Sequence, residues 1–153
     1  MNNSSESVVV CGAGGFIGGH LVSFLLKQGF KKVRAVDIKP LNNWFQVHTE
    51  AENLILDLRG IDHCQKAVHE CAWVFNLAAD MGGIGYIERN KRLCMMSVLI
   101  NTHLLLASTS AQVERFFFAS SACVYNHERQ DKPDSIALSE SDAYPANPQD
   151  GYG

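Results

Sequence analysis

The feature that most constrains the fold is a glycine-rich segment near the N-terminus that joins a strand-like run to a helix-like run. Residues 8–11 read VVVC, a short β-branched run typical of a buried strand. The next residues, GAGGFIG, place Gly12, Gly15 and Gly18 at intervals of three, and from Phe16 onward apolar residues return at helical spacing. A strand, a glycine turn and a helix in this order predict a sheet edge that binds a ligand at a helix N-terminus.

The rest of the chain continues the alternation of strand-like and helix-like segments. Further strands are expected at 31–38, 53–56, 73–79 and 115–121, with helices at 61–71 and over a long stretch ending near Ala111. Such alternation predicts an α/β fold, a doubly wound parallel sheet of the Rossmann-like NAD-binding type with right-handed crossovers. We expect residues 1–7 to form a flexible N-terminus and residues 8–153 to form one NAD-binding domain.

Composition narrows the function classes. The 153 residues are 46% hydrophobic and 19% charged, which suits one globular core, and a net charge of −3 with scattered basic residues argues against nucleic acid as a partner. The apolar stretch near 98–107 is interrupted by polar residues, and the N-terminus lacks a signal-peptide pattern, so we expect no membrane span and a cytoplasmic location. Five cysteines without a C-x-x-C pair predict reduced thiols and neither a disulfide framework nor a metal site.

Each glycine of the motif has a separate expected task in holding a dinucleotide. Gly12 permits the tight turn, Gly15 lets the backbone approach a diphosphate, and Gly18 lets helix and strand pack closely. The backbone amides at the start of the helix, at Phe16 and Ile17, would then bind the phosphates. The alternative is that these glycines mark an ordinary turn.

Asp37 stands 19 residues after Gly18, at the end of the second expected strand. A carboxylate there accepts hydrogen bonds from an adenosine ribose and repels a 2′-phosphate, which favours NAD over NADP. Arg34 and Lys39 are near enough in sequence to weaken this preference, and the alternative for Asp37 is a helix cap or turn residue. Asp57 and Leu58, just beyond the third strand, are candidate adenine-side contacts; the alternative there is a solvated loop.

Two further segments carry a family resemblance. NLAADMGGIGY follows the fourth expected strand and FFFASSACVY includes the fifth, and both resemble the extended short-chain dehydrogenase/reductase superfamily. Together with SESDAYPANPQDGYG, they look specifically like the GDP-mannose 3,5-epimerase family, over a range from about Val8 to Gly153. The resemblance implies an NAD-dependent enzyme that exchanges protons on a nucleotide sugar, with GDP-mannose as the expected substrate.

The resemblance also implies catalytic roles. Tyr152 matches the tyrosine that takes a proton from a sugar hydroxyl, Ser121 would hydrogen-bond the reacting oxygen, and Cys123 matches one acid/base of the proton exchange. The tyrosine's lysine partner is expected four residues later, at position 156, and the family's substrate lobe lies further on. The 153-residue chain therefore ends inside the catalytic helix, and we expect it to be inactive alone. The alternatives are a terminal aromatic for Tyr152 and a small buried hydrophobe for Cys123.

Other positions match the family's contacts with cofactor or substrate. Asn101 would bridge to the catalytic region through water, or bond only to its helix neighbours. The remaining matches are Leu77, Ala78 and Ala79 for the cofactor, and Gly82, Gly83, Ser121, Ala122 and Cys123 for the substrate.

Several alternatives stay open on the sequence alone. A different nucleotide-sugar epimerase or a 4,6-dehydratase is one, and a non-catalytic dinucleotide-binding module is another. The apolar stretch at 93–107 is compatible with a homodimer contact. We expect the phenylalanine run at 116–118 to be core packing, and Trp44 and Phe45 to cover either the adenine or the sheet edge.

Overall fold

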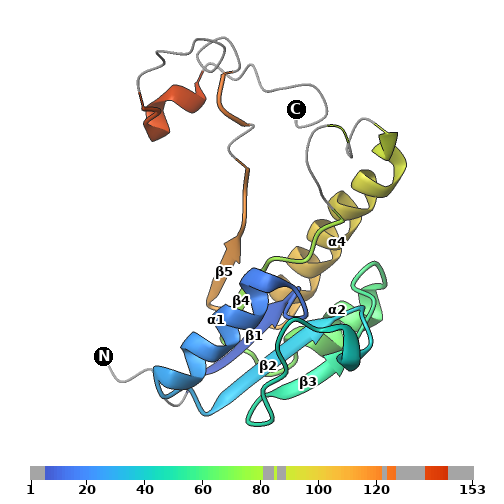
Figure 1. Cartoon of the computed structure of the whole chain (residues 1–153), viewed down its shortest axis with the longest axis vertical. Helices are drawn as coiled ribbons and strands as arrows, with labels where there is room; N and C mark the ends of the chain where they lie inside the picture. The colour runs from blue at the N-terminus through green and yellow to red at the C-terminus, as the bar shows by residue number, and fades with distance from the viewer. Residues whose placement is uncertain (1–5, 81–84, 86–88, 122–123, 127–136, 145–153) are drawn as a thin grey trace.

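A five-stranded parallel sheet forms the centre of the molecule (Figure 1). The computed structural model describes residues 6–80, 85, 89–121, 124–126 and 137–144. The strands follow the order β3-β2-β1-β4-β5. Their bounds are β1 (Ser7–Cys11), β2 (Lys32–Asp37), β3 (Glu52–Ile55), β4 (Trp73–Asn76) and β5 (Arg115–Phe118).

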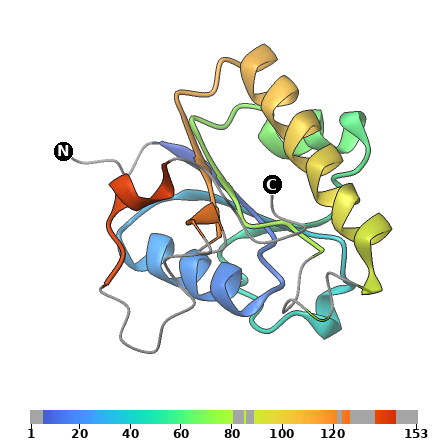
Figure 2. The ribbon, with the colours of Figure 1, turned by 90° about the horizontal axis from the view of Figure 1, so that it is seen from above.

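Helices cover both faces of this sheet. Figure 2 shows α1 on one side and α2 with α4 on the other. The strand order and the two helix layers confirm the predicted doubly wound α/β fold of the Rossmann type. The described helices are α1 (Phe16–Lys27), α2 (Ile61–Val68) and α4 (Lys91–Ser110), with two 3-10 turns, η2 (Leu41–Asn43) and η5 (Glu140–Ala143).

The core lies on both faces of β1, the central strand. Val8 and Val10 face the α1 layer, while Val9 and Cys11 face the α2 and α4 layer, and all four side chains are completely buried. Alternate side chains of a strand point to opposite faces, so a strand covered on both sides is apolar throughout. This explains why VVVC shows no polar alternation.

The strand order determines where a ligand can bind. From β1 the chain moves outward to β2 and β3, then returns across the sheet to β4 and β5. The connections leaving β1 and β4 therefore diverge at the carboxyl edge of the sheet, and a crevice opens between them. The glycine-rich loop after β1 lies at this switch point.

The β4–β5 side of the sheet is less buried than the sequence predicted. Phe116 packs on the α2 and α4 core, as expected, but Phe117 is 50% and Phe118 is 51% exposed. Trp73 and Phe75 of β4 are partly buried. The reason is that α1 contacts β1 and β2, while β5 is an edge strand (Figure 2).

Among the described helices, α4 is the one that could cross a bilayer by length and composition, with 20 residues and a mean hydropathy of 1.4. Its most apolar window is 22% buried within the structure. The helix packs against α2 in the layer that the two helices form on one face of the sheet. Its residue Leu104 is completely buried in this layer. In this structure α4 is thus a layer helix with an exposed outer face.

Candidate cofactor-binding site

The loop after β1 leaves no room for side chains at two of its glycines. Gly12 has a φ of +84°, and an added Cβ would lie 2.8 Å from the Leu77 backbone. An added Cβ at Gly18 would lie 2.2 Å from the Gly12 carbonyl oxygen. The predicted turn at Gly12 is confirmed, and so is the need for close packing at Gly18, although Gly18 packs on the loop itself rather than on the strand.

The N-terminus of α1 begins at the second glycine of the motif. Gly15 is the N-cap residue, no side chain caps the helix, and its first turn contains no acidic residue. Phe16 and Ile17, whose amides are predicted to bind the phosphates, form the start of the helix and are 62% and 68% exposed. Uncapped amides at the positive end of a helix dipole are suited to bind a diphosphate.

Asp37 is held beside this loop with both carboxylate oxygens hydrogen-bonded. The backbone amides of Gly14 and Lys39 donate to Oδ2 and Oδ1, each at 3.0 Å, and Asp37 is 7% exposed. Asp37 thus forms a turn and also lines the cleft, so the two interpretations of this residue are compatible. The sequence analysis did not single out Gly14. This position also has no room for a side chain, because an added Cβ would lie 2.8 Å from the Trp44 ring and 2.9 Å from Asp37 Cγ.

The two cations near Asp37 behave differently. Arg34 points away from the cleft, because it donates to Glu52 at 2.7 Å and to the carbonyl of Ala67, in α2, at 2.8 Å. Lys39 lines the cleft, with Nζ 3.4 Å from the Gly14 carbonyl oxygen. Lys39 is therefore the cation that bears on the choice between NAD and NADP.

Trp44 packs in the core beneath the glycine loop. It is 8% exposed, and its Nε1 donates to the Lys39 carbonyl at 2.8 Å. Phe45 is 56% exposed, and its ring centroid lies 4.9 Å from that of Phe16. Trp44 therefore supports the loop that carries Asp37, while Phe45 lies on the surface beside α1.

A cleft of about 390 Å³ runs along the carboxyl edge of the sheet. It brings together eight of the residues predicted to contact a cofactor: Gly12, Gly15, Asp37, Asp57, Leu58, Leu77, Ala78 and Ala79. It also includes seven residues that the sequence analysis did not single out for it: Ile38, Lys39, Leu56, Arg59, Asp80, Met96 and Ile100.

Asp57 is paired with its second neighbour in the chain. Arg59 Nε donates to the two carboxylate oxygens at 2.8 and 3.0 Å, and the terminal nitrogen also bonds to Oδ2. Hydrogen bonding to Arg59 holds the pKa of the Asp57 carboxyl below its ordinary value, and Asp57 raises the pKa of Arg59 in return. The predicted solvated alternative for Asp57 is replaced by an ion pair on the rim of the cleft.

Side chains of α4 hold the loop after β4. Asn101 accepts a hydrogen bond from Asn76 Nδ2, and Asn76 Oδ1 in turn accepts one from the Ala78 amide at 3.1 Å. One helical turn earlier, Ser97 Oγ accepts from the Asp80 amide at 3.0 Å. Asn101 thus acts through Asn76 and is not among the residues lining the cleft. The sequence analysis did not single out Ser97. The signal that could have found it is its position four residues before Asn101 in an otherwise apolar helix.

Much of the predicted catalytic set lies outside the described residues. Ser121 is described: it follows β5, is partly buried, and its carbonyl accepts from the Val124 amide at 3.2 Å. The roles given to the others stay predictions. They are Gly82, Gly83, Ala122, Cys123 and Tyr152.

The described cysteines close to the site are poor nucleophiles. Burial raises the pKa of the Cys11 thiol, just before the glycine loop, and raises that of Cys64 to about 11. The pKa of Cys71 is also shifted upward by burial. Because the thiolate is the reactive form, these three groups act as small apolar core residues.

These features define a class of protein. A parallel sheet with this strand order, a glycine loop without room for side chains, and a fixed carboxylate after β2 form a Rossmann-type dinucleotide-binding domain. Residues 8–153 match the model of the NAD dependent epimerase/dehydratase family. The chain belongs to that family, whose cofactor is NAD.

Individual relatives and solved structures agree with this assignment. The chain is 41% identical over 147 residues to GDP-mannose 3,5-epimerase 1 of Oryza sativa subsp. indica and 38% identical to GDP-mannose 3,5-epimerase of Arabidopsis thaliana. Each match covers 95% of this chain, but only 38% and 39% of the respective relative. Among solved structures, UDP-glucose 4-epimerase of Thermus thermophilus in complex with NAD superposes with a TM-score of 0.79 at 26% identity, covering 95% of this chain and 46% of that one.

Proposed function

We propose that this chain is the NAD-binding part of a nucleotide-sugar epimerase that converts GDP-mannose at C3 and C5. The observation that carries the proposal is the 41% identity to the rice GDP-mannose 3,5-epimerase across 95% of this chain. The more distant solved structures include enzymes of UDP-sugars, such as MoeE5 with UDP-glucose and NAD at 30% identity. The nucleotide-sugar class therefore has broader support than the choice of GDP-mannose.

The described residues fit NAD. The uncapped N-terminus of α1 and the open position of Gly15 suit the diphosphate, since an added Cβ at Gly15 would contact only the Gly12 carbonyl oxygen, at 3.3 Å. The fixed carboxylate of Asp37 suits the two hydroxyls of the adenosine ribose. When bound, NAD supplies a reversible hydride acceptor, so that the sugar can be oxidised at C4 and reduced again.

The proposed chemistry assigns a proton step to each catalytic residue. Tyr152 takes the proton of the C4 hydroxyl, and Ser121 hydrogen-bonds the same oxygen. A C4 ketone makes the hydrogens on C3 and C5 acidic. Cys123 and a second acid/base group can then act as a pair, one removing the proton from the carbon and the other returning a proton on the opposite face. A lysine one helical turn after such a tyrosine would lower the pKa of its phenol.

Two other functions follow from the same fold. One is a nucleotide-sugar epimerase or dehydratase with another substrate, and the other is a dinucleotide-binding module without catalysis. All three share the cleft and the Asp37 carboxylate. Binding measurements on the chain separate the dinucleotide part of the proposal from its sugar chemistry.

The first experiment compares NAD with NADP as ligands of the purified chain. We expect NAD to raise the melting temperature more than NADP does at the same concentration, since Asp37 repels a 2′-phosphate. Lys39, which lines the same cleft, is the group that would oppose this preference. Equal shifts, or a larger shift with NADP, would contradict the assignment of NAD.

We also propose that the chain self-associates through α4. Met95, Leu99 and Leu106 form an exposed apolar stripe on this helix, with exposed fractions of 63%, 37% and 57%. Sedimentation should show a dimer that Leu106→Glu disrupts. Phe24→Glu is the matched control, because Phe24 is 55% exposed on α1, across the sheet. A wild-type chain that sediments as a monomer at every concentration would overturn this part.

A further inference from the structure

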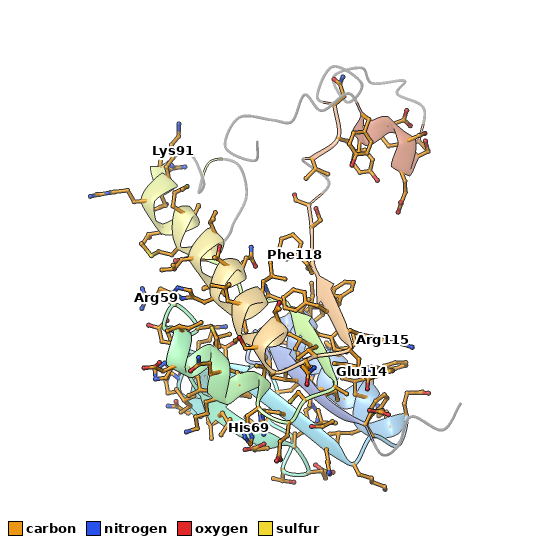
Figure 3. The ribbon with its side chains drawn as sticks, turned by 180° about the vertical axis from the view of Figure 1, so that it is seen from behind. Arg59, His69, Lys91, Glu114, Arg115 and Phe118 are labelled. Carbon is orange, nitrogen blue, oxygen red and sulfur yellow. The ribbon has the colours of Figure 1, made fainter. Side chains whose placement is uncertain are left out.

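Arg59 occupies a place in the cleft that the cofactor assignment does not explain. It lines the cleft together with Asp57 and Leu58, and its side chain is 47% exposed. Figure 3 labels Arg59 on the side of the sheet that α2 and α4 cover. We propose that Arg59 is a further binding residue whose guanidinium plane stacks against the adenine base of the cofactor. The inference rests on the proposed binding of NAD and adds the residue that reads the base.

The order of the strands places Arg59 at the adenosine end. The diphosphate subsite lies after β1, and Asp37, the ribose contact, lies after β2. β3 is the next strand outward, and Arg59 belongs to the loop that follows it. A dinucleotide laid along this edge from diphosphate to ribose therefore brings its base to the loop after β3.

The ion pair with Asp57 uses the edge of the guanidinium of Arg59. Nε donates to both carboxylate oxygens, at 2.8 and 3.0 Å, and these bonds lie at the edge of the group. A guanidinium bonded at its edge can still stack a planar ring on its face, whereas an ammonium has no plane to offer. The aliphatic residues Ile38 and Leu58 line the same cleft, which suits an uncharged planar base.

The loop that carries Arg59 is held in position before any ligand arrives. His103 Nδ1, from α4, donates to the Arg59 carbonyl at 2.9 Å, and the Gly60 amide donates to the Asp57 carbonyl at 3.1 Å. Asp80, across the cleft, contributes to the raised pKa of Arg59. A preorganised side chain loses little conformational entropy on binding, so its contact adds fully to affinity.

The test measures binding of three ligands, AMP, NAD and nicotinamide mononucleotide, by calorimetry on the purified chain. Arg59→Lys keeps the charge and the pairing with Asp57 but removes the plane. We expect it to weaken AMP and NAD by the same factor, about 5- to 20-fold, and to leave nicotinamide mononucleotide unchanged. Arg59→Ala should weaken them at least as much. Arg92→Lys, on the exposed start of α4, is the matched control and should change nothing.

The outcomes separate this inference from the proposed function. If the wild-type chain binds neither NAD nor AMP, the proposed function fails. If it binds both and Arg59→Lys binds AMP as well as wild type, Arg59 acts through charge or loop pairing and the stacking inference is overturned. An equal loss for nicotinamide mononucleotide would also overturn it, since that ligand has no adenine. Melting temperatures without ligand, expected to match wild type, show that each variant is folded.

Discussion

The two halves of the cleft are built in different ways. At the ends of β1 and β2, the site is formed by backbone: the glycine loop, the amides that fix Asp37, and the helix N-terminus of α1. After β4, the loop that lines the site is held by side chains of α4, by Ser97 directly and by Asn101 through Asn76. Beyond it, β5 carries residues such as Phe118 that are half exposed (Figure 3).

The difference shows which changes each half can tolerate. A backbone cradle without free space fails when a single methyl group is added, because the neighbouring atoms are themselves backbone and cannot move aside. A side-chain support loses its hydrogen bonds one at a time. We therefore expect large effects of small substitutions in the first half and graded effects in the second.

The largest effect is expected at Gly18. Gly18→Ala would place a methyl group 2.2 Å from the Gly12 carbonyl oxygen, which forces loop and helix apart. We expect a loss of about 3 kcal/mol or more in the free energy of unfolding, measured by denaturant titration. Gly29→Ala is the matched control, because Gly29 has a φ of +90° and nothing within 4 Å of an added Cβ. That variant should lose only the conformational cost, about 1–2 kcal/mol. Equal losses would mean that space at Gly18 is not limiting.

A change of charge at Asp37 should act mainly on binding. Asp37→Asn removes the negative charge and one of the two acceptors that hold the Gly14 and Lys39 amides. We expect the affinity for NAD to fall about tenfold and the preference over NADP to shrink, as measured by calorimetry. Asp62→Asn, in the exposed first turn of α2, should leave both affinities unchanged. An unaltered NAD affinity in the first variant would remove Asp37 from the site.

Two serines of α4 offer a matched pair in the second half. Ser97→Ala removes the acceptor for the Asp80 amide, and we expect a loss of about 1 kcal/mol in the free energy of unfolding. Ser108 is buried as well, but within the described part of the chain its hydroxyl has no hydrogen-bond partner. Ser108→Ala should therefore be neutral or stabilising. If both variants behave alike, Ser97 does not support the loop after β4.

The smallest effect is expected in the free energy of unfolding at alkaline pH. The pKa of Cys64 is raised by burial from its ordinary value near 9 to about 11. Between pH 9 and 11 the thiol is ionised in the unfolded chain but still protonated in the folded chain. The stability that the chain has below pH 9 is therefore lost as the pH rises toward 11. Unfolding free energies should fall less steeply over this range for Cys64→Ala than for wild type. Cys94→Ala, at a partly exposed position, is the control and should keep the wild-type slope.

The parts of the fold predicted best from sequence are those whose signal is local. The segment from β1 through α1 to Asp37 follows the expected order closely, because burial on both faces of β1 and the helical period of α1 both appear in the residues themselves. The fourth and fifth strands were expected to be longer, at 73–79 and 115–121, but end at Asn76 and Phe118. The end of a strand depends on where its neighbour stops pairing, which local sequence does not contain.

The same division applies to the cleft. Gly12, Gly15 and Asp37 could be predicted because spacing alone relates them to a dinucleotide. Arg59 and Ser97 could not, because their positions depend on how a loop turns or which face of a helix meets the sheet. The burial expected for Phe117 was wrong for a related reason: hydrophobicity predicts a preference for the core, not the presence of a covering helix.

The amino-acid sequence by itself determined that this chain forms a parallel sheet with a dinucleotide loop after its first strand, because glycine spacing and strand burial are short-range properties. Only the tertiary structure decided that Asp37 is fixed by two amides, that α4 holds the loop after β4, and that Arg59 pairs with Asp57 on the rim of the cleft. The physical reason is that hydrogen bonds between separate elements depend on how those elements pack, and packing is a property of the whole fold.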